Sequence, residues 1–240
     1  VLWENHSHRP TRDVDLLFLK PHDLDELDAI FRAVTATPVG PDGITFDANS
    51  IQTTQIREAS NYGGIRIKMV GYIGNARVPI QVDIGLGDAV YPEPQWTQFT
   101  TLLDLPAPRI RPYPAETVVA EKLQALVELG MRNTRMKDFY DLLYLQQRFE
   151  FAGPVLQHAI QQTFLRRKTP LPSGIPDGLS ADFANLKQRH WQAFLGKNQL
   201  GGEKDFASIC RRIASFALPP MQNQPLHKTW LPEHGWSEAD

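Results

Sequence analysis

Apolar and polar residues alternate along much of the first third of the chain, as they do in strands with one packed face. In VPIQVDIGL, residues 78–86, every second residue from the first valine is aliphatic, which leaves Asp83 on the opposite face. Three earlier runs, GITF, SIQTTQIRE and GGIRIKMVGYIG, are also alternating or β-branched. The Gly74-Asn75 break predicts a hairpin between the last of these runs and ARVPIQVDIGLG.

Helical spacing of apolar residues occurs once early in the chain and then throughout its second half. Leu24, Leu27 and Phe31 predict an amphipathic helix over residues 21–34. Beyond the proline-rich connector PAPRIRPYPAE, helices are predicted over residues 115–129, 134–148, 154–167, 183–195 and 203–216. The predicted fold class is α+β, with a mixed β-sheet subdomain over residues 1–105, a helical subdomain over 106–218 and an irregular tail over 219–240.

Composition indicates a globular protein that does not enter the membrane. Of the 240 residues, 42% are hydrophobic and 22% are charged, and no apolar run approaches the roughly 20 residues that span a bilayer. The single cysteine, Cys210, excludes an internal disulfide and favours a reducing, cytoplasmic location. The net charge is −2, so contact with nucleic acid would depend on local clusters. The densest cluster, Arg166, Arg167 and Lys168, is either such a contact or a solvated helix end.

Two carboxylates stand one residue apart in DVDLLF, residues 13–18. In a strand, Asp13 and Asp15 project from one face, where like charges this close repel and call for protons, basic neighbours or a cation. A hard divalent cation with oxygen ligands is the natural guest. Asp83 adds a third carboxylate on a later strand. Metal ions such as Mg²⁺, held by three carboxylates, can activate a hydroxyl and neutralise leaving pyrophosphate, so the trio matches the requirements of nucleotidyl transfer.

Polar residues also interrupt the apolar faces of two predicted helices. Lys122 lies in an apolar stripe, and it is either a lysine that snorkels to solvent or one aimed at a phosphate. Asp138 and Asp141 each lie four residues before a leucine, on the side expected to pack inward. Surface ion pairs with Arg135 or Lys137 are the alternative for these acids. Together with the strand carboxylates they form a polar set whose burial would be costly without partners or ligands.

Four sequence blocks follow one another through nearly the whole chain. They are RPTRDVDLLF, REASNYGGIRIKMVGYIGNARVPIQVDIGLGDAV, YPAETVVAEKLQALVELGMRNTRMKDFYDLLYL and RHWQAFLGKNQL. In this order they closely resemble the AbiEii/AbiGii toxin family of nucleotidyltransferases, which includes the MenT toxins. The most specific parts are AEKLQALVELG and RMKDFYDL, because D-x-D alone is common.

The resemblance implies a minimal polymerase-β-like nucleotidyltransferase subdomain followed by a helical subdomain, with the site between them. It implies a Mg²⁺-dependent enzyme that uses an NTP and acts as the toxin of a toxin–antitoxin pair, with a cognate antitoxin protein as partner. Some relatives add nucleotides to the 3′ end of tRNA. The expected metal ligands are Asp13, Asp15 and Asp83; the expected catalytic residues are Asp13, Asp15, Lys122 and Asp138; the expected nucleotide contacts are Lys122, Asp138, Asp141 and Arg12.

One feature of the family is missing from the start of the chain. Its members carry, about ten residues before D-x-D, a Gly-Gly or Gly-Ser turn whose backbone N–H groups would hold nucleotide phosphates. The stretch before Asp13, VLWENHSHRPTR, lacks this turn. We therefore expect the chain to be truncated at its N-terminus, or else to have lost this phosphate cradle and much of its activity.

Three functions stay open on the sequence. The first is Mg²⁺-dependent transfer of a nucleotidyl group from an NTP to a hydroxyl on RNA, at the tRNA 3′ end. The second is the same transfer to a small molecule, as in antibiotic nucleotidyltransferases, which use a similar set of acids. The third is a catalytically silent homologue that binds a nucleotide or a partner, because the phosphate-binding turn is missing.

Overall fold

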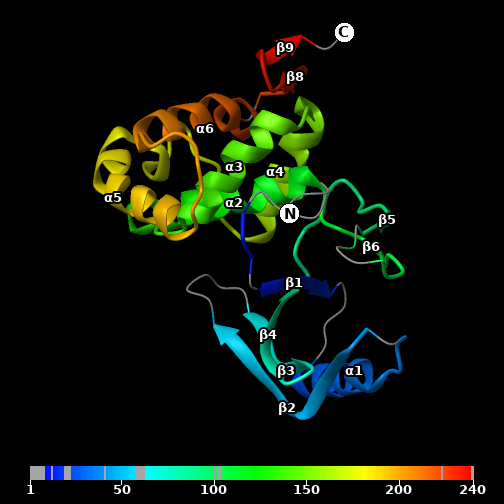
Figure 1. The fold of residues 1–240 in the computed structure, drawn as a ribbon. Coiled ribbons are helices and arrows are strands. Elements are labelled where there is room, and N and C mark those ends of the chain that lie inside the picture. The colour runs from blue at the N-terminus through cyan, green and yellow to red at the C-terminus, as the bar shows by residue number, and fades with distance from the viewer. Residues whose placement is uncertain are drawn as a thin grey trace. The chain divides into compact units, whose positions relative to one another are not determined.

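The computed structural model describes residues 9–11, 13–18, 23–40, 42–57, 63–99, 101, 104–222 and 224–238. It confirms the α+β fold class, with a mixed sheet in one compact unit and most of the helices in another (Figure 1). The α/β unit comprises Pro10–Asp88 and Thr101–Pro106, and the helical unit comprises Val1–Arg9, Ala89–Thr100 and Ala107–Asp240.

The α/β unit contains a four-stranded sheet. Its strands are β1 (Asp13–Phe18), β2 (Ile44–Arg57), β3 (Gly63–Ile73) and β4 (Ala76–Leu86), in the order β1-β4-β3-β2. β1 runs parallel to β4, whereas the other pairs are antiparallel. The predicted hairpin is confirmed: β3 and β4 join at Gly74, whose φ of 56° is left-handed and suits glycine. β2 unites two predicted runs in one strand, with a register shift between Asp47 and Gln52.

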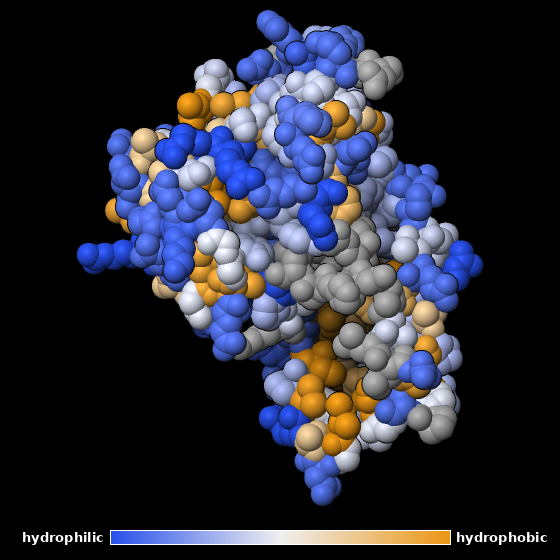
Figure 2. Space-filling model, turned by 45° about the horizontal axis from the view of Figure 1, so that its top comes forward, coloured by the Kyte–Doolittle hydropathy of each residue, from blue (hydrophilic) through white to orange (hydrophobic). Residues whose placement is uncertain are grey.

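A helix, α1 (Leu24–Ala36), packs on the apolar face of this sheet. Its start is defined by a capping box, in which Asp23 and Glu26 each accept a hydrogen bond from the other's backbone N–H. Leu27 and Phe31 are buried against the sheet. Apolar side chains at the margins of the sheet stay exposed, and Figure 2 shows an apolar patch on this unit. The exposed residues include Val14, Leu16, Ile44, Phe46 and Ile73.

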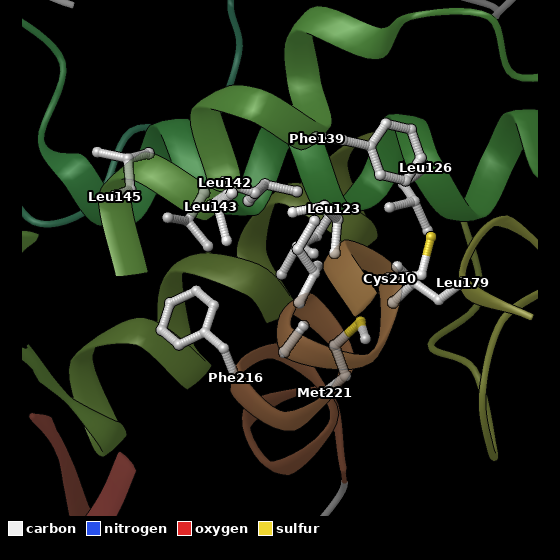
Figure 3. Packing of buried hydrophobic residues seen from close by; sticks show 14 of the residues in the cluster. Leu123, Leu126, Phe139, Leu142, Leu143, Leu145, Leu179, Cys210, Phe216 and Met221 are labelled. Atoms are coloured by element: carbon white, nitrogen blue, oxygen red, sulfur yellow. The ribbon is translucent and has the colours of Figure 1, made fainter. Parts of the chain in front are cut away.

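The described part of the helical unit contains five α-helices close to the predicted ranges. They are α2 (Ala115–Leu129), α3 (Met136–Arg148), α4 (Gly153–Arg166), α5 (Ala181–Lys197) and α6 (Phe206–Met221), with 3₁₀ turns at Gly130–Arg132 and Asp177–Leu179. Leucines of α2 and α3 meet Cys210, Phe216 and Met221 of α6 in one core (Figure 3). Among the described residues, no helix has the length and apolar character needed to cross a membrane.

The C-terminal end of α6 departs from the prediction. The helix continues to Met221 instead of ending near Phe216, and it includes Pro219 and Pro220 in its last turn. Pro220 has no N–H to donate to the Phe216 carbonyl four residues earlier. The indole N–H of Trp236 donates to this carbonyl at 3.0 Å instead. A tertiary hydrogen bond thus replaces the one that proline removes, and the helix tolerates its prolines.

The tail, predicted to be irregular, carries two strands. β8 (Lys228–Leu231) pairs with β9 (Gly235–Glu238) and also with the short β7 (Phe151–Ala152), which precedes α4. Trp230 of β8 meets the Phe216 and Trp236 rings edge-on and donates from its indole to a backbone carbonyl of α3 at 2.7 Å. The tail is therefore fastened to the helical core by aromatic packing and by strand pairing.

The hydrogen bond at the end of α6 can be tested by a double-mutant cycle. Trp236→Phe should lower the free energy of unfolding by about 1 kcal/mol, because it leaves the Phe216 carbonyl without a donor. In a Pro220→Ala background the same change should cost less, since the new Ala N–H can donate to that carbonyl. Urea unfolding of the four proteins measures the difference. An equal cost in both backgrounds would show that Trp236 acts through packing alone.

Candidate functional site

The three acids predicted as metal ligands lie on β1 and β4. The parallel register pairs Asp15 of β1 with Asp83 of β4, and Asp13 with Gln81. Paired residues of neighbouring strands point to the same side, and so do residues two apart on one strand. Asp13, Asp15 and Asp83 therefore share one face of the sheet, opposite the face that packs against α1. Asp13 and Asp15 are exposed, and Asp83 is half-buried.

Asp83 is already held by a side chain from β3. The Arg66 guanidinium donates from Nε to Oδ1 and from Nη2 to Oδ2, each at 2.7 Å, in a two-point ion pair. Gln81 Nε2 also donates weakly to Asp83, at 3.4 Å. Within the part of the chain that the structure describes, no three His, Cys, Asp or Glu side chains are grouped so that they could hold a metal ion. The predicted trio thus shares a face without forming a ready-made metal site.

Arg66 was not predicted from the sequence, although the spacing of residues around the hairpin turn indicates its position. Gly74 and Asn75 form the turn of the β3–β4 hairpin, and Arg66 lies eight residues before it as Asp83 lies eight residues after it. A two-residue turn fixes the register of the whole hairpin. Counting outward from the turn therefore places Arg66 directly opposite Asp83.

In the helical unit, the ammonium group of Lys122 joins α2 to α3. Its Nζ lies 3.0 Å from Oδ1 of Asp138 and 2.8 Å from Oδ2 of Asp141. The two carboxylates are buried, with side chains 2% and 1% exposed, and the Lys122 side chain is 15% exposed. The lysine head thus lies between two buried carboxylates instead of snorkelling to bulk solvent. The structure brings together these three predicted residues, and their catalytic roles stay predictions.

Two arginines complete this ion network. Arg9 forms a two-point pair with Asp141, with Nε at 2.6 Å from Oδ1 and Nη2 at 2.7 Å from Oδ2. Arg135 donates from Nε to Asp138 at 2.6 Å, as the surface ion-pair alternative supposed, but the acid that it meets is buried. Arg9 lies 132 residues from Asp141, so no local spacing could reveal this pair. The network, defined as Arg9, Lys122, Arg135, Asp138 and Asp141, sets three cations against two carboxylates.

The electrostatics of Lys122 follow from its surroundings. Burial by itself would lower the pKa of the ammonium group, because a charged form is poorly solvated there. The charges of Asp138 and Asp141, with their hydrogen bonds, outweigh burial and raise the pKa of Lys122 above its usual value. Lys122 is therefore a permanent cation at neutral pH.

Three other residues noted in the sequence are Arg12, Arg167 and Cys210. Arg12 lies outside the described residues. Arg167 is the middle residue of the basic run, and its guanidinium contacts α2. It donates a hydrogen bond to Gln124 at 3.0 Å and forms an ion pair with Glu121 at 3.1 Å. Cys210 belongs to the core of the helical unit, and burial there raises the pKa of its thiol to about 12.

Comparison with known proteins shows the family of the chain. The sequence matches the family described as Nucleotidyl transferase AbiEii toxin, Type IV TA system, over residues 1–212. The chain therefore belongs to the AbiEii family of nucleotidyltransferase toxins, a family of toxin–antitoxin systems. No curated protein matches the sequence.

Two solved structures from one bacterium are similar at low sequence identity. A candidate nucleotidyltransferase from H. pylori shares 16% identity and a TM-score of 0.45, over 85% of this chain and 78% of that chain. JHP933 from Helicobacter pylori shares 15% identity and a TM-score of 0.46, over 85% of this chain and 76% of that chain.

Removal of the Lys122 charge should destabilise the helical unit. We expect Lys122→Met to lower the free energy of unfolding by about 3 kcal/mol, because it leaves two buried carboxylates without their shared cation while Arg9 and Arg135 stay in place. Urea unfolding measures this loss. The control is Arg211→Gln, which removes an exposed pair with Asp205 whose atoms are 3.6 Å apart, and it should cost less than about 0.5 kcal/mol.

The pH dependence of this loss follows from the direction of the pKa shift. A lysine whose pKa is raised on folding stabilises the folded state. This stabilisation is fully present below the unfolded-state pKa of about 10.4, and it is lost only as pH rises through the higher folded-state pKa. The difference between wild type and Lys122→Met should therefore stay constant from pH 7 to about 9. A variant as stable as the wild type at pH 7 would show that the network contributes little to folding.

Proposed function

We propose that this chain is a Mg²⁺-dependent nucleotidyltransferase toxin that transfers a nucleotidyl group from an NTP to the 3′-terminal hydroxyl of tRNA. The observation that carries the proposal is the register of β1 and β4, which sets Asp15 beside Asp83 with Asp13 on the same sheet face. Membership of the AbiEii family supports the reaction class. The identity of the acceptor rests on the family resemblance of the sequence.

The side chains on this face suit Mg²⁺ by their chemistry. Asp13 and Asp15 are exposed residues, and carboxylate oxygens are the ligands that a hard cation prefers. Asp83 suits the ion only after Arg66 releases it, because both of its oxygens are engaged. A bound Mg²⁺ would help to activate the acceptor hydroxyl and to neutralise charge on the phosphates.

In the helical unit, Lys122 is the residue that we assign to the NTP phosphates. Its ammonium group stays protonated and is oriented by Asp138 and Asp141. A cation held in place before the nucleotide arrives needs little reorganisation when charge develops on the phosphates. Asp138 and Asp141 would thus orient the cation as well as contact the nucleotide, and Arg12 is proposed as a further nucleotide contact.

A second candidate function is a catalytically silent nucleotide-binding homologue. It is favoured by the two-point Arg66–Asp83 pair, which occupies the third carboxylate of the trio. An ion pair of this kind would compete with a metal ion for Asp83. Transfer to a small molecule is the alternative acceptor for an active enzyme.

Asp15→Asn should separate these functions. With radiolabelled NTP and bulk tRNA, we expect the variant to lose transfer by about 1000-fold, since a metal-binding carboxylate supplies several kcal/mol to the transition state. The melting temperature should be unchanged, because Asp15 is exposed. Asp104→Asn, an exposed acid elsewhere in the same unit, is the matched control.

Each alternative predicts a different result in this assay. Label on a small hydroxylated acceptor but not on tRNA would favour the small-molecule enzyme. NTP binding by calorimetry without transfer to any acceptor would favour the silent homologue. Full transfer by Asp15→Asn would contradict the assignment of the strand acids.

A further inference from the structure

A short two-stranded ribbon of the helical unit presents an aromatic and cationic face. β5 (Thr97–Gln98) pairs antiparallel with β6 (Arg109–Ile110), with Gln98 opposite Arg109. One residue beyond the pairing, Trp96 lies against Arg111, with the guanidinium carbon 6.0 Å from the ring centroid. We call Trp96, Gln98, Arg109 and Arg111 the Trp96 ribbon face.

The indole of Trp96 is exposed although two cations lie next to it. Trp96 keeps 61% of its surface in solvent, and the guanidinium carbon of Arg109 is 5.7 Å from its centroid. Arg111 is oriented by bonds to the Pro94 carbonyl at 3.3 Å and to Glu93 at 3.1 Å. Arg109 has no acidic partner among the described residues, so its charge is not neutralised by a neighbouring carboxylate.

The ribbon is fastened to the helices at its base. The Thr117 hydroxyl, on α2, accepts from the Tyr91 N–H at 3.0 Å and donates to the Tyr91 carbonyl at 2.8 Å. The Tyr91 ring meets His158 of α4 edge-on, with centroids 4.3 Å apart. Lys122 follows Thr117 on the same helix by five residues, a rise of about 7.5 Å along the axis. The helix that anchors the ribbon thus also carries the proposed phosphate contact.

We propose that the Trp96 ribbon face binds single-stranded RNA, with a base stacked on Trp96 and a backbone phosphate on Arg109. Exposed aromatic rings beside guanidinium groups provide the two contacts that such strands use, base stacking and phosphate neutralisation. The proposal rests on the proposed function in that the acceptor is RNA, and it adds the surface that would hold the strand.

The surroundings of the ring favour RNA over a protein partner. Tryptophan and arginine are also common in protein interfaces, where they lie in a desolvated and well-packed centre. Here the residues next to Trp96 along the chain are Gln95, Thr97 and Gln98, all polar and exposed. In the basic run, Arg167 is already bonded to Gln124 and Glu121.

The test is the affinity of the whole chain for a short fluorescein-labelled oligouridylate, measured by anisotropy over a range of salt concentrations. Trp96→Ala should weaken binding about 10-fold without changing the salt dependence, and Trp96→Phe should restore most of the affinity. Arg109→Gln should weaken binding and lower the slope of log K against log salt by about 0.7, the value for one phosphate contact on a single strand. Arg211→Gln, with a side chain 72% exposed, should leave both quantities unchanged.

Several outcomes would overturn the proposal. The first is that the wild type does not bind oligouridylate, and the second is that Trp96→Ala binds it with unaltered affinity. The third is that an oligoglutamate peptide competes for the site as well as RNA does, which would make an acidic protein the occupant. Failure of the proposed function gives a different result: the wild type would bind RNA through Trp96 and transfer no nucleotide.

Discussion

The burial of two carboxylates on α3 is the constraint on which the helical unit depends. Asp138 and Asp141 are almost fully buried among apolar side chains, where an unpaired charge would cost several kcal/mol. Lys122 bonds to both acids and so joins α2 to α3. Arg9 adds a second cation to Asp141 and ties the segment before β1 to the same helix. Charge neutralisation, as much as apolar packing, therefore determines how these segments meet.

The same rule governs the acid face of the sheet. Asp83 is half-buried and takes its partner, Arg66, from the neighbouring strand. Asp13 and Asp15 lie at the edge strand of the sheet, where water can solvate them. The half-buried Asp83 is thus held by a fixed guanidinium partner on the neighbouring strand. A ligand that needs Asp83 must therefore compete with this ion pair.

Helix α2 links the features of the helical unit that bear on function. Its first turns hold the base of the ribbon through Thr117, and the next turn carries Lys122. A buried helix is a rigid support, because its packed face leaves little freedom of rotation. A strand bound at the ribbon and a phosphate bound at Lys122 would therefore both be positioned by one element. Sites built on regular elements keep their geometry better than sites built on loops.

The sequence by itself determined the elements and the faces of the strands. Periods of two and 3.6 residues predicted the strands of the four-stranded sheet and the helices α1 to α5 to within a few residues, since local side-chain spacing decides which face can pack. The turn at Gly74 determined the hairpin register, and with it the Arg66–Asp83 pair that we did not predict. Alternation along β4 placed Asp83 on the polar face, because the aliphatic residues on either side of it must turn inward.

The contacts between distant segments were decided only by the tertiary structure. The Arg9–Asp141 pair, the pairing of β7 with β8 and the Trp236 bond that supports the end of α6 all join residues far apart in the sequence. No local spacing encodes such pairs, because each forms only when packing has brought its partners together. The burial of Asp138 and Asp141 shows the division clearly. Their place on the inward face and the reach of Arg135 could be read from the sequence, but the pairs with Lys122 and Arg9 were identified only in the folded chain.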